Sequence, residues 1–132
     1  VGHGTASFSF RVAEAAKRQG IHPDTISTDI YRGNRLNGPV YSMANVLSKF
    51  LYLGYSLEEV IAAVTTQAAQ WLGREKLGRI QVGDPAHLTL FVVKEEPVEL
   101  VDSEGERRVS NRRIEAKGVI VHGKFIKCEV RA

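Results

Sequence analysis

Apolar residues recur at helical spacing over the first 73 residues, and this pattern predicts three helices. The first ends at Gly20, with Ser7 or Thr5 as its N-cap, and the second ends at Gly54. The third begins at Ser56, which forms a capping box with the glutamate three residues later. The apolar faces of these helices consist of Phe8, Val12, Ala15 and Ala16, of Val40, Met43, Val46, Leu47, Phe50 and Leu51, and of Val60, Ile61 and Val64.

Two stretches without helical spacing lie between the first two helices. Residues 25–30 are rich in β-branched side chains and are bounded by turn residues, which predicts a short buried strand. Asn34, Asn37 and Gly38 precede Pro39 and predict a loop. A helix, a short link and a buried strand are typical of an α/β unit.

After Gly73 the pattern changes to short apolar runs separated by turns, which predicts strands. Isolated hairpins are marginally stable in water, so this β-layer needs another surface to cover it. The predicted strands are residues 78–82, 88–93, 98–101, 107–109, 114–121 and 124–130, with turns at 83–85, 102–105 and 122–123.

Composition narrows the functional classes. The 132 residues are 43% hydrophobic and 25% charged, which is typical of a globular domain, and the net charge of +3 comes from acidic and basic residues mixed along the chain. This mixture gives little support to nucleic-acid binding. A single cysteine, Cys128, excludes a disulfide framework and favours the cytoplasm, and no apolar run is long enough to span a membrane. The chain begins without Met, which suggests a segment of something longer.

Asp29 is the acidic residue with the strongest functional signal. It lies near the end of the otherwise uncharged run 25–30, where a carboxylate is normally avoided. The C-terminal ends of strands are where α/β proteins bind ligands, so a carboxylate there could bind a divalent cation or accept a proton from water. A purely structural alternative is that Asp29 caps the following turn.

His3 lies between two glycines, where a preceding strand would lead into the first helix. Glycines on both sides allow a substrate to approach the backbone, whereas the alternative is an ordinary loop histidine. Residues 31–38 follow Asp29 directly and are expected at the same rim, where Arg32 or Arg35 could hold a carboxylate. His22, His87 and His122 are expected to be structural, and no two of them have the spacing of metal ligands.

Four motifs together resemble the C-terminal third of an amidohydrolase-superfamily metalloenzyme, of the dihydroorotase-like group whose members are called deacetylases or adenine deaminases. The resemblance covers essentially the whole chain. One departure is that His87 stands where the family's returning turn usually has Asp. The motifs are Gly2-His3-Gly4-Thr5-Ala6-Ser7-Phe8-Ser9-Phe10, Pro23-Asp24-Thr25-Ile26-Ser27-Thr28-Asp29, Asn37-Gly38-Pro39-Val40 and the run from Leu77 to Phe91.

The resemblance implies a fold and a set of roles. Residues 1–73 would form the last two βα units of a TIM-type (β/α)₈ barrel, and residues 74–132 would form strands of an accessory β-sandwich domain. Asp29 would match the strand-8 aspartate that serves as metal ligand and general base, and the cofactor would be a divalent metal, zinc being expected. His3 and Gly4 on the strand-7 loop, with Asn37 and Gly38 on the strand-8 loop, would face a small-molecule substrate. The family's other metal ligands belong to earlier strands.

Two functions from different classes follow. In the first, the chain is part of a metal-dependent hydrolase that opens an amide, cyclic amide or amidine-type C–N bond. In the second, it is a non-catalytic α/β binding or assembly module in which Asp29 caps a turn. Since the exposed strand edges need cover, we expect either a companion N-terminal portion of the barrel or a homo-oligomer as partner.

Overall fold

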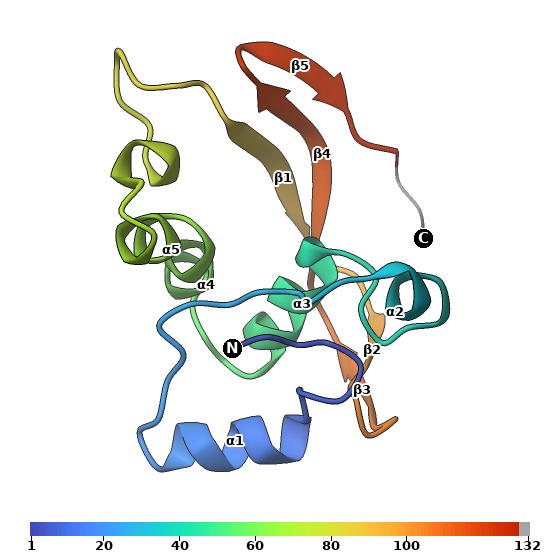
Figure 1. Cartoon of the computed structure of the whole chain (residues 1–132). Coiled ribbons are helices and arrows are strands. Elements are labelled where there is room, and N and C mark those ends of the chain that lie inside the picture. Colours follow the sequence, from blue (N-terminus) through green and yellow to red (C-terminus); the bar gives the residue numbers. More distant parts are fainter. Residues whose placement is uncertain (130–132) are drawn as a thin grey trace.

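The computed structural model describes residues 1–129 and shows a mixed α/β chain (Figure 1). Five α-helices and one 3₁₀ helix precede five strands within this range. The helices are α1 (Phe10–Arg18), α2 (Arg32–Asn37), α3 (Met43–Tyr52), α4 (Leu57–Val64), α5 (Thr66–Trp71) and the 3₁₀ helix η1 (Glu75–Gly78). The strands are β1 (Leu88–Lys94), β2 (Val98–Val101), β3 (Arg107–Ser110), β4 (Arg113–Val121) and β5 (Lys124–Lys127).

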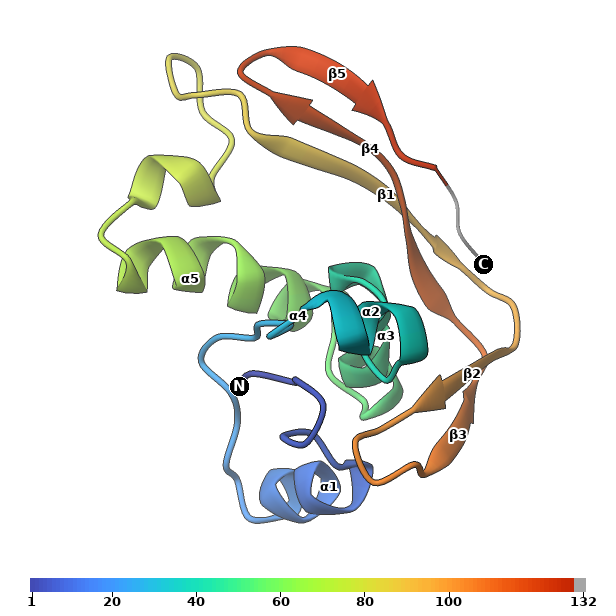
Figure 2. The same cartoon turned by 45° about the vertical axis from the view of Figure 1, so that its right-hand side comes forward.

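The strands form two antiparallel sheets, one of three strands in the order β1-β4-β5 and one made by the β2–β3 hairpin. In Figure 2 all helices lie on one side of the β1–β4–β5 sheet, and no element of residues 1–129 covers its other side. Large apolar side chains are accordingly exposed on this sheet, among them Leu90, Phe125 and Ile126.

The core lies between α3 and β4. Phe10, Val46 and Val60 are buried there together with Leu100 and Ile114, so both the helices and the strands contribute to one cluster. Ser48 joins the two layers through its hydroxyl, which donates to the Ala44 carbonyl at 2.7 Å and accepts from the Ile114 N–H at 2.9 Å.

Most elements expected from local pattern are confirmed. The second and third helices, the Ser56 capping box, the strand at 88–93 and both hairpins are present. Of the predicted 124–130 strand, residues 124–127 form β5, residues 128–129 do not continue it, and residue 130 lies outside the described residues.

Several expectations were wrong. The N-cap of the first helix is Ser9, two residues after Ser7 and four after Thr5, because Phe8 pairs its backbone with Ser103 instead of entering the helix. Residues 32–37 form α2 and not a loop. Residues 78–82 form no strand. They lead into a turn, and their apolar side chains Ile80 and Val82 are almost fully exposed instead of packing against a sheet.

The predicted strand at 25–30 is reduced to one isolated parallel bridge between Gly2 and Ser27. Its second half cannot continue the pairing because Asp29 has a left-handed φ of 48°.

No helix among the described residues is long and apolar enough to cross a membrane.

Candidate functional site

Two segments far apart in sequence lie side by side and carry Asp29 to one edge. Residues 1–4 run parallel to residues 25–28, with Ser27 N–H donating to the Val1 carbonyl at 2.7 Å and His3 N–H donating to the Ser27 carbonyl at 3.1 Å. The Gly4 N–H then donates to the Thr28 carbonyl at 3.0 Å. Because the two segments point the same way, Gly4 and Asp29 meet where both end.

The backbone of Asp29 is held by Asn34. The left-handed conformation of Asp29 is uncommon for a residue other than glycine, although aspartate tolerates it better than most. The Asn34 side chain is buried; its amide donates to the Asp29 carbonyl at 3.0 Å, and its oxygen accepts from the Tyr31 N–H at 2.9 Å. Asn34 therefore fixes the turn through which Asp29 leaves the parallel pairing.

The carboxylate of Asp29 is exposed and, among residues 1–129, accepts no hydrogen bond and forms no ion pair. Gly4 lies directly against it, since a Cβ added to Gly4 would meet Asp29 Oδ2 at 2.6 Å. Gly4 also has a φ of +56°, which favours glycine. The close contact and the positive φ both favour glycine at position 4, and the missing side chain leaves room for the Asp29 carboxylate.

His3 lies below this edge and is 1% exposed. Its Nδ1 is 2.8 Å from the Gly4 carbonyl and its Nε2 is 2.8 Å from Lys49 Nζ, while its ring stacks on Phe8 at 4.7 Å between centroids. Since a carbonyl only accepts, Nδ1 carries the proton and Nε2 accepts from Lys49. Burial lowers the pKa of His3 to about 4, which keeps the ring neutral at neutral pH.

Lys49 is fully buried on α3 and joins two segments. Its Nζ donates to His3 Nε2 and, at 2.9 Å, to the Pro39 carbonyl. Burial lowers the pKa of Lys49 to about 8, whereas the charge of Asp102 opposes this shift. The amine is therefore mainly protonated at neutral pH.

Asp102 supplies the balancing negative charge from the β2–β3 turn. It is 2% exposed, and its carboxylate accepts from the N–H groups of Phe10, Glu104 and Glu106, each at 2.9 Å. The β2–β3 hairpin is thereby fastened to the start of α1, next to the segment that carries His3 (Figure 2).

The second predicted substrate loop carries Asn37 and Gly38. Asn37 is exposed at the end of α2, and Gly38, with φ +76°, lies against the Tyr41 hydroxyl. No hydrogen bond within the described chain joins either residue to Asp29, but Lys49 ties the next residue, Pro39, to His3. Across the rim, Thr5 Oγ1 and the Tyr31 hydroxyl lie 2.9 Å apart, and both residues are exposed.

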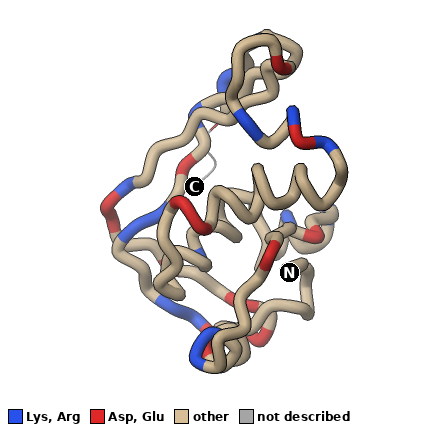
Figure 3. The backbone as a smooth tube through the Cα atoms, turned by 90° about the vertical axis from the view of Figure 1, so that its left-hand side faces the viewer, with Lys and Arg blue, Asp and Glu red and all other residues tan. Residues whose placement is uncertain are grey.

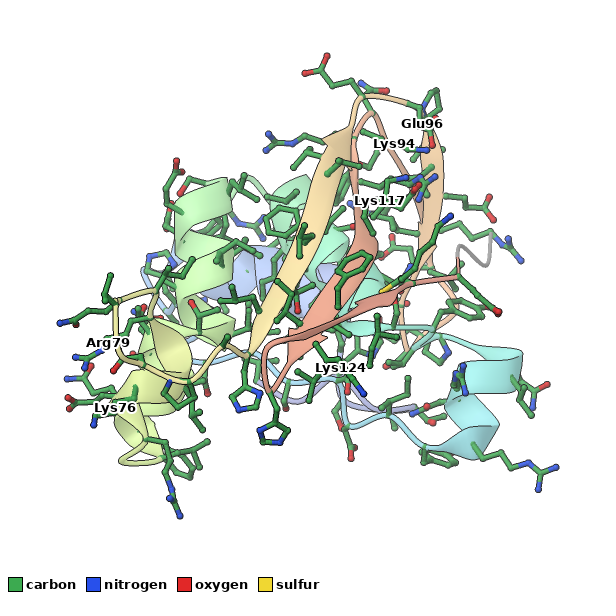
Figure 4. The ribbon with its side chains drawn as sticks, turned by 90° about the horizontal axis from the view of Figure 1, so that it is seen from above. Lys76, Arg79, Lys94, Glu96, Lys117 and Lys124 are labelled. Atoms are coloured by element: carbon green, nitrogen blue, oxygen red, sulfur yellow. The ribbon has the colours of Figure 1, made fainter. Side chains whose placement is uncertain are left out.

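A second polar cluster lies on the sheet. The buried Glu115 carboxylate contacts Lys94 and Arg113 at 2.9 and 2.8 Å and also pairs with Lys117. Lys117 and Lys94 lower the pKa of Glu115 to about 2. Figure 4 shows Lys94 and Lys117 near Glu96 at one part of the sheet, away from Lys76 and Arg79. Each cation of this cluster has a carboxylate partner within the protein. Figure 3 likewise shows acidic and basic residues interspersed along the backbone.

Sequence reasoning missed Asn34, Lys49 and Asp102. A signal existed for Lys49, which lies at helical spacing from Val46 on the apolar side of α3, where a lysine is rarely left unpartnered. The contact of Asp102 with Phe10 gave no local signal, because the two residues are 92 apart in sequence. The partners of Asn34 are only three and five residues away, but the prediction of a loop there hid its role.

Only one candidate metal ligand is present at this edge. Among residues 1–129, no three His, Cys, Asp or Glu side chains come together to hold an ion. His87 and His122, which were expected to be structural, touch edge to face with ring centroids 4.5 Å apart, yet no third ligand joins them in the described structure. The Asp29 carboxylate, with exposed oxygen atoms and no competing protein partner, fits a metal ion as one ligand of a larger set.

Comparisons with known proteins agree on one family. The model of the amidohydrolase family matches residues 2–127. A deacetylase of Enterococcus faecalis is 41% identical over 125 residues, which are 95% of this chain and 34% of that protein. A crystal structure of an adenine deaminase superposes with a TM-score of 0.92 at 40% identity, over 96% of this chain and 34% of the other. A crystal structure of a dihydroorotase superposes with a TM-score of 0.86 at 36% identity, over 95% of this chain and 33% of the other.

The chain spans about a third of the length of these relatives and matches their C-terminal part. The amidohydrolase superfamily is generally metal-dependent. With a family match over nearly the whole chain and close superposition on two related structures, this chain belongs to the amidohydrolase family.

Proposed function

We propose that this chain is the C-terminal part of a metal-dependent amidohydrolase that hydrolyses a C–N bond of the amide, cyclic amide or amidine type in a small molecule. The observation that carries the proposal is the exposed Asp29 carboxylate, held at the end of two parallel segments by Asn34 and given space by Gly4. The names of the relatives, deacetylase, adenine deaminase and dihydroorotase, support C–N hydrolysis as the reaction class.

The proposed architecture assigns residues 1–73 to the last two βα units of a (β/α)₈ barrel and residues 74–132 to an accessory β-sandwich domain. The parallel bridge between Gly2 and Ser27 supports the first assignment, because neighbouring barrel strands are parallel. The antiparallel β1–β4–β5 sheet with an uncovered face supports the second. A companion N-terminal portion would supply the other barrel strands, with a second copy of the chain as the alternative cover. A cytoplasmic location stays a prediction from cysteine use.

Asp29 is assigned two roles, metal ligand and general base. A divalent metal, zinc in this proposal, would be held in part by the Asp29 carboxylate and would supply the Lewis acidity that polarises the scissile group and lets water lose a proton near neutral pH. Asp29 accepts that proton as the C–O bond forms, and returns it to the leaving nitrogen as the C–N bond breaks. Asn34 and Gly4 keep the carboxylate at a fixed position for both transfers.

Substrate contacts are assigned to the two loops beside Asp29. Asn37 offers an exposed amide, whereas Gly4 is buried and is assigned the space that it leaves beside the Asp29 carboxylate. Gly38 shapes the second loop beneath Tyr41. His3 was predicted to face substrate; because both of its ring nitrogens have protein partners, we now assign its side chain to support of the Gly4 backbone.

The alternative is a non-catalytic binding or assembly module in which Asp29 only terminates a turn. The two proposals separate in the full-length protein that carries this segment, assayed on an N-acetylated amine, adenine and dihydroorotate. We expect wild-type turnover of one of them, and a fall in kcat of about 10²–10⁴-fold in Asp29→Asn. Asp24→Asn, an exposed aspartate before the same strand segment, is the matched control and should retain full activity. Asp29→Asn with more than about a tenth of wild-type kcat would reduce Asp29 to a turn residue.

A further inference from the structure

We infer that Lys49 is a positioning residue that holds both proposed substrate loops in register through a single buried side chain. This inference rests on the proposed function of the Asp29 edge. One loop is residues 2–5, which Lys49 reaches through His3, and the other is residues 37–39, which it reaches at the Pro39 carbonyl.

The two hydrogen bonds of Lys49 link groups that are otherwise ten and 46 residues away from it in sequence. The Nζ to His3 Nε2 distance is 2.8 Å and the Nζ to Pro39 carbonyl distance is 2.9 Å, both short enough for charge-assisted bonds. The amine is carried by one helix, α3, so both loops are attached to the same element.

His3 extends the link toward Asp29. With Nε2 accepting from Lys49, the ring must carry its proton on Nδ1, and this N–H donates to the Gly4 carbonyl at 2.8 Å. Gly4 is the residue whose missing side chain leaves room for Asp29 Oδ2. The orientation of the Gly4 peptide therefore depends on the His3 tautomer, and the tautomer depends on Lys49.

Charge balance explains why a lysine can occupy this position. Within residues 1–129, the buried anion near the pair is Asp102, whose carboxylate is satisfied by three backbone N–H groups and still attracts Lys49. Removing the ammonium would leave His3 Nε2 and the Pro39 carbonyl without a donor and Asp102 without its cation. Both loops lose their anchor together, which distinguishes Lys49 from a residue that stabilises one loop.

The test compares Lys49→Met with Lys17→Met in the full-length protein. Methionine keeps the apolar stem and length of the buried side chain while removing the ammonium. Lys17 is the matched control because its Nζ lies 5.2 Å from the centroid of the Tyr55 ring, away from both loops. We expect Lys49→Met to raise KM by about 10- to 100-fold with a much smaller change in kcat and an unchanged metal content, since Asp29 is intact.

Amide hydrogen exchange provides a readout independent of activity. Lys49→Met should speed exchange in peptides covering residues 2–8 and 37–40 while leaving β4 unchanged, and Lys17→Met should leave all three unchanged. A KM within twofold of wild type together with unchanged exchange in both loops would overturn the inference. Faster exchange throughout, β4 included, would do so as well, because it would mean general loss of stability.

Two further arms keep the inference separate from the proposed function. If the wild-type protein hydrolyses none of the C–N substrates, the proposed function fails, while exchange at the two loops still decides whether Lys49 holds them. If Lys49→Met does not fold, ¹⁵N NMR of histidine-labelled wild-type protein replaces it. A neutral His3 protonated at Nδ1 supports the link, and protonation at Nε2 contradicts it, because Nε2 could then accept nothing from Lys49.

Discussion

Around Asp29, residues 1–5 and 25–39 combine a short stretch of backbone pairing with hydrogen bonds from buried polar side chains, whereas β1, β4 and β5 are held by regular backbone pairing and leave apolar side chains exposed. In the first region these side chains are Asn34, His3 and Lys49. In the second region, β1 and β4 pair over seven positions with one register shift after Leu90. The comparison indicates that the structure fixes the position of the Asp29 side chain, whereas it leaves one face of the β1–β4–β5 sheet uncovered.

Among variants that test this difference, we expect Gly4→Ala to have the largest effect, a loss of kcat. A methyl group would meet Asp29 Oδ2 at 2.6 Å, so the carboxylate must move, and a displacement of about 1 Å can cost about 10²-fold in rate. Gly20→Ala is the matched control, since Gly20 also has a positive φ, +75°, but nothing lies within 4 Å of the added methyl group. We expect both variants to lose similar stability and only Gly4→Ala to lose kcat. Equal kcat in the two variants would contradict the assigned role of Gly4.

Acid should weaken the Asp29 region through His3. Burial lowers the pKa of His3 from 6.5 to about 4, so between these pH values the unfolded chain binds more protons than the folded one. Stability should therefore be complete above pH 6.5 and fall as the pH decreases toward 4, by about 3 kcal/mol. Denaturant titration from pH 7 to 4 measures this, and His3→Phe, which keeps the stack on Phe8, should flatten the slope. The lowered pKa of Glu115, about 2, acts at more acidic pH. A His3→Phe slope equal to that of wild type would place the acid sensitivity elsewhere.

Asn34→Ala should cost less, about 1–2 kcal/mol, because the Asp29 carbonyl and the Tyr31 N–H both lose a buried partner. Asn37→Ala is the matched control on the same helix; its side chain is exposed, so its free energy of unfolding should change by less than about 0.5 kcal/mol. Chemical denaturation of both variants checks the difference. Equal losses would show that Asn34 is not the support of the turn.

The smallest effect on stability is expected at the open sheet. Phe125 is 59% exposed and lies over Gly118, so Phe125→Thr should change the free energy of unfolding by less than about 0.5 kcal/mol. The same substitution should reduce self-association of the isolated 132-residue chain, because exposed apolar sheet surface promotes pairing. Light scattering measures this. A wild-type chain that is monomeric at all concentrations would remove the need for a covering partner.

The same contrast explains what the sequence could predict. The strand at 88–93 and the Ser56 capping box depend on neighbours within a few residues, so their patterns were sufficient. The strand predicted at 25–30 depended on a partner and on the turn at Asp29, and only its bridge to Gly2 formed. Likewise, Asp29 could be selected from its position, but its supports could not, because Lys49 lies 46 residues from His3 and Asp102 lies 92 residues from Phe10.

The central claim is that Asp29 contributes one ligand to a catalytic metal. The most direct measurement is a crystal structure of the full-length protein grown with zinc, with the metal identified by anomalous scattering. We expect an Asp29 carboxylate oxygen about 2.0–2.2 Å from the ion, with the Gly4 and Asn34 contacts retained. A zinc ion bound without Asp29, its carboxylate instead accepting hydrogen bonds from backbone N–H groups of the following turn, would contradict it.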